Sequence, residues 1–362
     1  MANKIITFSA ETERDLIPAW RDYVTHYRAE HFSTKKIYDT TKDLHTKELL
    51  VNKAIDAEVS RAAGLSNLNC SLVGKQALIT NPMYIWATFA VLNKLVDVVT
   101  PDVVAEDFYA FANVQTVGKG NNGSFTIKSS DLFEVEVNGN SRRHVSAQKQ
   151  FTGTKTLTPV NHTITTQVDL YRILAGEESL AEYAMKIILS IESQIALDIA
   201  YAMQDSFDTR TANFKESSFT PVAFKTLATR VGAANGGSRA IAVGTEIGLM
   251  DVMPQDDYLK LGLGETYNSI GYLPVFLNTP LLALAQKIDW SSADYDFAIS
   301  NKFIYFVSPG LQKLVQIVFE DEGLVIADNV FTNNNLTQNA SMHKAWKTGL
   351  ITGAKHGVMK LS

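Results

Sequence analysis

Residues 117–140 read VGKGNNGSFTIKSSDLFEVEVNGN, and residues 146–158 read SAQKQFTGTKTLT. The first run opens in a Gly/Asn-rich turn and then alternates apolar and polar side chains, as a β-strand does. Asn138-Gly139 favours a tight turn with positive φ, and the second run is the return path. This two-stranded arm has too few large apolar groups for its own core, and an isolated hairpin is marginal in water. We therefore expect it to dock on another copy of the chain.

A strand and a long helix follow the arm. Residues 163–171 alternate apolar and polar side chains, and from Glu177 to Asp205 apolar residues recur at spacings of three and four. The apolar positions are Leu180, Tyr183, Ala184, Ile187, Ile188, Ile191, Ile195, Ile199 and Met203. At 1.5 Å per residue this helix spans on the order of 40 Å. Because average helices have only about 11–12 residues, we expect this helix to be the spine of the fold.

Composition sets the limits for the whole chain. Its 362 residues, 46% of them hydrophobic, suffice for one large or two ordinary domains. A net charge of −5 does not favour a general polyanion-binding protein. The single cysteine, Cys70, excludes an internal disulfide framework and a multi-cysteine zinc site. With no signal-peptide pattern and no apolar run near the roughly 20 residues of a membrane helix, we expect a soluble protein made inside the cell.

The N-terminal third is expected to be helical. Helices are predicted over Glu11–Arg28 and Thr41–Ala63, and their narrow apolar stripes suggest that they lie on a surface. A further helix is predicted from Pro82 to about Val96, because proline suits the first turn of a helix. Pro101 follows, and a separate short helix is predicted over Val103–Phe111.

From about Phe207 the pattern is that of a compact mixed domain with long loops. Helices are predicted over Pro221–Val231 and Thr245–Met253. Strands are predicted over Arg239–Gly244, Gly271–Leu277, Phe297–Ser300, Phe303–Val307 and Leu314–Phe319. Two last strands, around Trp346 and Val358, are expected to return toward the strand that precedes the long helix.

The sequence motifs give little support for a catalytic site. Gly118, Gly120 and Gly123 match a dinucleotide fingerprint, but that motif needs a following helix to hold a pyrophosphate, and here a strand follows. Cys70 reads as a buried structural cysteine, and the seven histidines form no His-x-x-x-His pair. We therefore expect no enzyme activity, no cofactor and no metal.

Charge is unevenly distributed between the arm and the long helix. The arm has more cations than anions, whereas the long helix has many carboxylates and one lysine. Such a pair suits a head-to-tail contact between copies, although both could be merely solvated faces. The candidate contact residues are Lys128, Arg142, Arg143, Lys149 and Lys155 on the arm and Glu178, Glu182 and Glu192 on the helix.

Four short segments, taken in chain order, resemble segments of the tailed-phage major capsid proteins, which share the Hong Kong 97 shell fold. GSFTI at 123–127 resembles the start of that family's extended loop, and TKTLTPVNHTIT at 154–165 resembles its exit. LYRILAG at 170–176 is similar to the lead-in to the spine helix, and AWKTGLITGAKHG at 345–357 to the last sheet strands. The resemblance covers most of the chain after about residue 80.

The resemblance implies an α+β fold with four parts. They are an N-terminal helical arm over 1–116, an extended loop over 117–162, a peripheral domain with the spine helix over 163–212 and 323–362, and an axial domain over 213–322. It implies hexamers and pentamers of an icosahedral head around double-stranded DNA, which is bound without sequence specificity. Some relatives crosslink a loop lysine, but no motif here selects a donor, and we do not predict crosslinking.

The resemblance also implies the partners and the location. The partners are further copies of the chain, a separate scaffold protein, a portal protein and, as a further candidate, a decoration protein; a membrane is not among them. The location is the shell of the virion, after synthesis in the bacterial cytoplasm. Two alternatives stay open at this point: an encapsulin-type compartment shell that encloses cargo enzymes, and a soluble nucleotide-binding enzyme that uses the glycine turn.

Overall fold

The computed structural model describes residues 10–31, 37–64, 81–108, 112–129, 133, 135, 147–175, 177–254, 267–289, 292–308, 313–327, 337–351 and 353–361. Helices are α1 (Ala10–His31), α2 (Leu44–Ala63), α4 (Pro82–Asp107), α5 (Leu170–Ala175), α6 (Leu180–Thr209), η1 (Ala212–Phe214), α7 (Pro221–Ala234) and α8 (Glu246–Met250). Strands are β1 (Ala112–Val117), β2 (Gly123–Lys128), β3 (Thr152–Leu157), β4 (Val160–Asp169), β5 (Lys215–Glu216), β6 (Ile241–Thr245), β7 (Val275–Phe276), β8 (Thr279–Leu284), β9 (Phe303–Val307), β10 (Val315–Glu320), β11 (Leu324–Ala327), β12 (Thr337–Leu350) and β13 (Gly357–Lys360). The predicted α+β class is confirmed.

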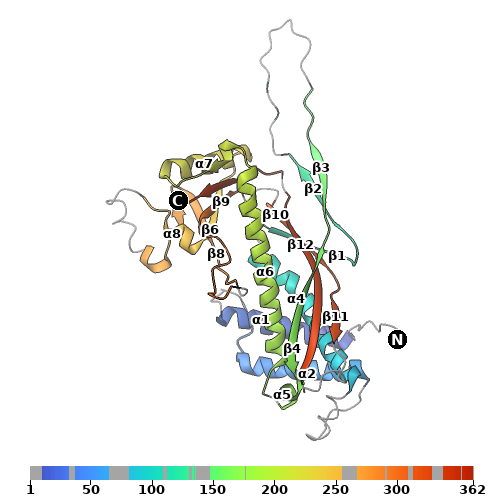
Figure 1. The fold of residues 1–362 in the computed structure, drawn as a ribbon. Helices are drawn as coiled ribbons and strands as arrows, with labels where there is room; N and C mark the ends of the chain where they lie inside the picture. The colour runs from blue at the N-terminus through green and yellow to red at the C-terminus, as the bar shows by residue number, and fades with distance from the viewer. Residues whose placement is uncertain are drawn as a thin grey trace.

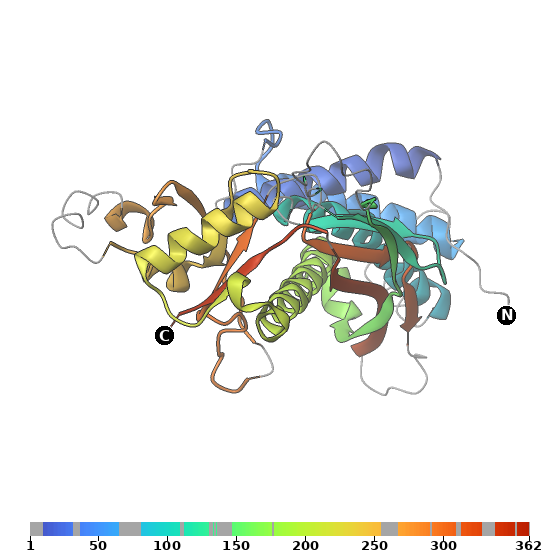
Figure 2. The same ribbon diagram turned by 90° about the horizontal axis from the view of Figure 1, so that it is seen from above.

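Helix α6 divides the molecule, with one sheet on each side of it (Figures 1 and 2). Ser179 begins the helix as its N-cap, because its side chain accepts a hydrogen bond from the amide of Glu182. The helix has 30 residues, longer than its predicted span of Glu177–Asp205, and the predicted apolar stripe is its buried face. Figure 2 shows this helix between the two sheets, as expected of a spine.

The first sheet is built around β12. This strand pairs with β4 along one edge and with β11 and then β10 along the other, all antiparallel. The parallel partner of β10 is β1, whose residue Ala112 aligns with Val315. As predicted, the C-terminal strand around Trp346 returns to the strand before the long helix. The indole Nε1–H of Trp346 also donates to the Asp198 carboxylate on α6, at 3.2 Å.

The second sheet has the order β5-β13-β9-β6-β8-β7 and packs against α7 and α8. Its core includes Phe224, Phe276 and Phe306, whose rings meet edge to face. The structure differs from the predicted strands here in two respects. The expected strand over Phe297–Ser300 is only a bridge between Ile288 and Phe297, and β8 had not been expected.

The predicted domain boundaries do not follow the strand pairing of the two sheets. Strand β10 falls in the predicted axial segment, yet it pairs with β12 in the first sheet. Strand β13 falls in the predicted peripheral segment, yet it pairs with β9 in the second sheet. The division into domains stays a prediction.

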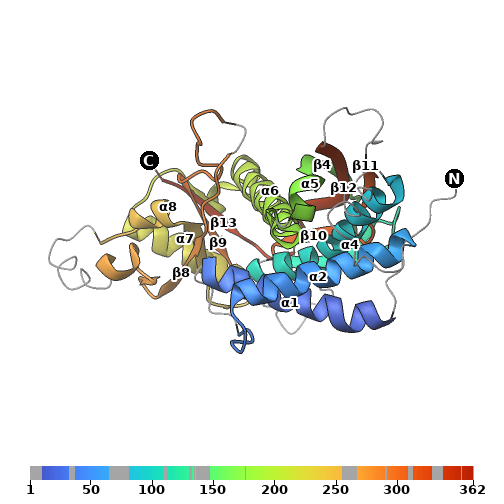
Figure 3. The same ribbon diagram turned by 90° about the horizontal axis from the view of Figure 1, so that it is seen from below.

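The N-terminal helices lie in the core, so the expectation of surface helices was wrong. Trp20 and Tyr23 of α1 and Val51 and Ile55 of α2 are fully buried in the main apolar cluster. Figure 3 shows both helices side by side beneath α4 and α6. In α1 a narrow apolar stripe suffices, because the aromatic side chains of Trp20 and Tyr23 cover much area from few positions.

Helix α4 continues through Pro101, so the expected break there is absent. Pro82 occupies its first turn as predicted, and the side chain of Asn81 caps it by accepting from the amide of Met83. By length and composition alone, the span from Pro82 to Glu106 could cross a membrane, but most of it is buried inside the protein. It contacts α1, α2 and α6, as a core helix does.

Candidate functional site

The arm begins as the two-stranded ribbon β2–β3, as predicted. Gly123 to Lys128 pair in antiparallel register with Leu157 to Thr152. Figure 1 shows the ribbon rising from the upper end of the first sheet, at the opposite end of the molecule from α1 and α2. Of the residues between the two strands, Ser129, Phe133, Val135 and 147–151 are described. The predicted Asn138-Gly139 turn lies outside the described residues.

The root of the arm is held by a small apolar cluster of its own. Phe125 packs with Val318 of β10 and with Ile351, and Leu157 lies against it from β3. A Cβ on Gly123 would lie 2.4 Å from Val318 Cγ2, so the ribbon approaches β10 at a distance that only glycine allows. This cluster fixes where the arm leaves the body.

The glycine turn before the arm is a structural turn. The amide of Asn121 donates to the Gly118 carbonyl at 3.0 Å, and Gly120 has φ +77°. The amide of Gly120 donates to the Glu320 carboxylate, and the amide of Asp321 donates to the Val117 carbonyl at 2.9 Å. A strand, β2, follows the turn as predicted, whereas a dinucleotide fingerprint needs a helix at this place to hold the pyrophosphate.

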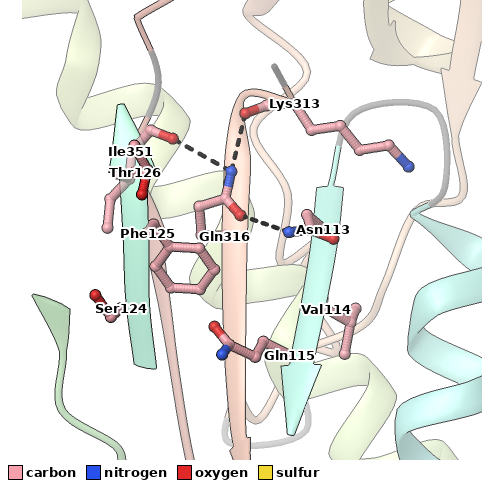
Figure 4. A pocket seen from close by; sticks show the side chains of 9 residues that line it. All are labelled: Asn113, Val114, Gln115, Ser124, Phe125, Thr126, Lys313, Gln316 and Ile351. Atoms are coloured by element: carbon pink, nitrogen blue, oxygen red, sulfur yellow. Dashed lines mark hydrogen bonds between the residues drawn. The ribbon is translucent and has the colours of Figure 1, made fainter. Parts of the chain in front are cut away.

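A polar groove lies beside this root, between β1 and β2 (Figure 4). The Gln316 side chain lies at its centre: its amide nitrogen donates to the carbonyls of Lys313 and Ile351, and its oxygen accepts from Asn113, at 3.1–3.3 Å. Phe125, Ser124 and Thr126 line the β2 side. The side-chain amide of Gln316 already has hydrogen-bond partners within the chain. We therefore interpret the groove as a structural contact between the arm and the first sheet.

Beyond the root the arm presents large apolar side chains to solvent. Phe133, Val135 and Phe151 are 59%, 89% and 68% exposed. Lys119, Lys128, Lys149 and Lys155 are also exposed, and the described residues between 112 and 168 include no carboxylate side chain. The described part of the arm is therefore basic and apolar, a composition typical of a binding surface.

The predicted contact residues fall into three groups. Lys128, Lys149 and Lys155 are exposed as expected, and Arg142 and Arg143 lie outside the described residues. Glu178 and Glu182 are also exposed, and each forms an ion pair with a neighbour, Arg172 at 3.3 Å and Lys186 at 3.1 Å. A contact of these residues with another subunit stays a prediction.

Glu192 differs from that expectation, because the structure buries it inside its own chain. Its carboxylate bonds Arg28 of α1 at 2.5 Å and Lys287, which follows β8, at 2.8 Å. Burial by itself would raise the pKa of this carboxyl, but the two cations outweigh burial and hold the pKa below its ordinary value. The helical period of α6 places Glu192 on the buried face beside Ile191 and Ile195. A direct contact of its side chain with the arm of another subunit is therefore excluded.

A second buried ion pair holds α4 against the first sheet. Lys344 of β12 bonds the Asp97 carboxylate, which also accepts from the amide of Gly323 at 2.9 Å and from Asn93 at 3.2 Å. Neither buried pair could be predicted from the sequence, since each joins residues far apart in the chain. Among the described residues, no three His, Cys, Asp or Glu side chains gather as a metal site.

Comparison with known proteins finds similarity only among solved structures. No family model matches the chain, and no curated protein matches it. The fold is similar to the mature capsid of bacteriophage PhiM1, with a TM-score of 0.47, 10% identity, and coverage of 70% of this chain and 86% of that one. It is similar to the capsid of the native GTA particle, with a TM-score of 0.47, 14% identity, and coverage of 71% and 90%. It is also similar to the capsid of Helicobacter pylori bacteriophage KHP30, with a TM-score of 0.45, 11% identity, and coverage of 70% and 90%.

Proposed function

We propose that this chain is a structural shell protein, the major capsid protein of a tailed phage, and that it assembles into the hexamers and pentamers of an icosahedral head around double-stranded DNA. The arm carries the proposal. Phe133, Val135 and Phe151 are exposed on a segment that leaves the body, and the cluster at its root reaches only as far as Ile127 and Leu157. Exposed apolar side chains gathered on one extension indicate a protein partner.

The partner that suits the arm is a further copy of the chain. A two-stranded ribbon is only marginally stable in water unless another surface covers it. The body of its own chain contacts the arm at the root. A head-to-tail contact, in which the arm of each copy lies on the body of the next, generates a closed ring when the rotation between copies closes. Such a ring is a capsomer, and the arm then supplies contact instead of catalysis.

The resemblance supplies the finer parts of the proposal. The extended loop is 117–162, the peripheral domain is 163–212 with 323–362, and the axial domain is 213–322. A scaffold protein, a portal protein and a decoration protein are the proposed additional partners. The proposed location is the virion shell, after synthesis in the host cytoplasm.

Electron microscopy of the expressed chain, alone and with a co-expressed scaffold, tests the proposal. Closed shells or rings are the expected result. A chain that sediments as a monomer at every concentration and with every scaffold contradicts it. The neighbouring genes separate a phage head from a cargo compartment, because portal and terminase genes belong to the first and a single cargo enzyme to the second.

A further inference from the structure

Residues 286–289 and 292–299, between β8 and β9, are the described part of a hairpin, called the 286–299 hairpin below, which polar contacts hold at its base. Gln286 Nε2 donates to the Ile299 carbonyl and to Asn301 Oδ1, both at 2.8 Å, and Gln286 Oε1 accepts from the amide of Ile299 at 3.1 Å. At the same base, Lys287 bonds the buried carboxylate of Glu192 at 2.8 Å. The hairpin therefore has a fixed direction relative to α6.

The described part of the hairpin tip is ordered by its own hydrogen bonds. The amide of Asp289 donates to the Asp296 carbonyl at 2.8 Å, and the Ser292 hydroxyl donates to the Asp296 carboxylate at 2.7 Å. Tyr295 has φ +54°, in the left-handed region that a bulky residue rarely adopts. A loop ordered in this way loses little conformational entropy when it binds.

Among the described residues of this hairpin, two aromatic rings are exposed. Tyr295 is 64% exposed and Phe297 is 55% exposed. Asp294 and Asp296 are exposed beside them, and the one cation of the segment, Lys287, is engaged with Glu192. The outer surface of the hairpin is thus aromatic and acidic. Aromatic anchors on a preorganised loop are typical of the energetic centre of a protein interface.

We infer that the 286–299 hairpin is the docking point for the arm of a neighbouring copy. The inference rests on the proposed function and names the surface that receives the arm. The described arm carries the complementary properties: exposed lysines at 128, 149 and 155 and exposed apolar rings at Phe133 and Phe151. Opposite charges steer the encounter and set the register, and the apolar side chains supply the buried contact.

The arm and the hairpin of one chain do not face each other. Figure 2 shows the hairpin, an orange loop, on the far side of α6 from β2 and β3. The contact therefore joins two copies, and each copy uses a different surface, so the geometry is heterologous. This contact replaces the predicted one between the arm and the buried Glu192.

Charge reversal tests the contact in the full-length chain. Asp294→Lys with Asp296→Lys is expected to lower the assembled fraction by about tenfold or more, because like charges then face each other. Adding Lys149→Asp and Lys155→Asp to the same chain should restore assembly. The matched control, Asp205→Lys with Asp208→Lys, makes the same charge change on exposed positions of α6 and should assemble as the parent does.

Disulfide trapping gives an independent readout. In a Cys70→Ser background, Phe151→Cys with Phe297→Cys should yield a ladder of covalent multimers after oxidation, whereas either cysteine alone should yield dimers at most. Shells that form normally despite the reversed aspartates, and that give no ladder, overturn the hairpin inference but leave the shell function standing. A parent chain that forms no particle under any condition overturns the shell function itself. Circular dichroism of each variant shows that a loss of assembly is not a loss of folding.

Discussion

At the scale of single residues, two positions carry unusual constraints. Gly123 lies where the arm passes β10, and the neighbouring Val318 leaves no room for a side chain. Glu192 lies where α1, α6 and the base of the 286–299 hairpin meet, and its two cationic partners are 164 residues before it and 95 residues after it in the sequence. Both positions tie the arm or the hairpin to the body.

Gly123→Ala is expected to lower the free energy of unfolding by about 1–3 kcal/mol, because a Cβ there overlaps Val318 and the sheet must shift. Ser124→Ala is the matched control, because Ser124 is exposed and adjacent, and it should change stability by less than about 0.5 kcal/mol. Denaturant unfolding measures both. Equal stability of the two variants would show that the root is not packed as described.

Glu192→Gln is expected to cost about 3–5 kcal/mol at neutral pH, because it removes the buried negative charge with which Arg28 and Lys287 both pair. The folded pKa of Glu192 is lowered, so its stabilisation is complete above the unfolded pKa and is lost as the pH falls through the folded pKa. The difference between parent and variant should therefore shrink below about pH 4. Glu182→Gln, on the exposed face of α6, should cost about 0.5 kcal/mol or less at any pH.

At the scale of elements, the sequence predicted what local periodicity encodes and missed what distant segments impose. The long helix and the β2–β3 ribbon were predicted correctly, because a regular apolar spacing and a glycine turn act over a few residues. The burial of α1 was missed, because only contact with α4 makes Trp20 a core residue. The continuation of α4 through Pro101 was missed for the same reason: packing on both sides outweighs the local cost of proline.

Trp20→Ala tests whether α1 belongs to the core. The loss of this fully buried indole, whose Nε1–H donates to the Leu95 carbonyl at 3.2 Å, should destabilise the chain by about 3–5 kcal/mol. Leu49→Ala on the exposed side of α2 is the control and should have little effect. Thermal unfolding measures both. A stable Trp20→Ala variant would return the N-terminal helices to the surface role predicted from the sequence.

At the scale of the whole molecule, the apolar core and the proposed assembly surface are separate. The core clusters lie along α4 and α6 and in the second sheet, whereas the exposed apolar side chains of the arm take part in neither. The sequence predicted the arm and its lysines, but it could not reveal the hairpin surface, because the fold of distant segments decides which aromatic rings remain exposed.

Phe151→Ser should leave the unfolding free energy unchanged within about 0.5 kcal/mol, because the ring is exposed in the single chain. It should nevertheless reduce shell formation, because the ring is expected to be covered in the assembly. Val222→Ser is the matched control: that side chain is also exposed, but it lies at the start of α7. Light scattering during assembly and denaturant unfolding of the dissociated chain separate the two effects. A stability loss without an assembly defect would place Phe151 in its own chain's core.

The parallel pairing of β1 with β10 has a consequence for synthesis on the ribosome. Asn113 and Gln316, which bond across the arm root, are 203 residues apart, so the arm leaves the ribosome long before its anchor exists. Val318 and Ile351 must both be made before the root cluster can close. A chain that lacks Val318 and Ile351 therefore cannot close the root cluster, and in the proposed shell its arm would have no fixed direction relative to the body.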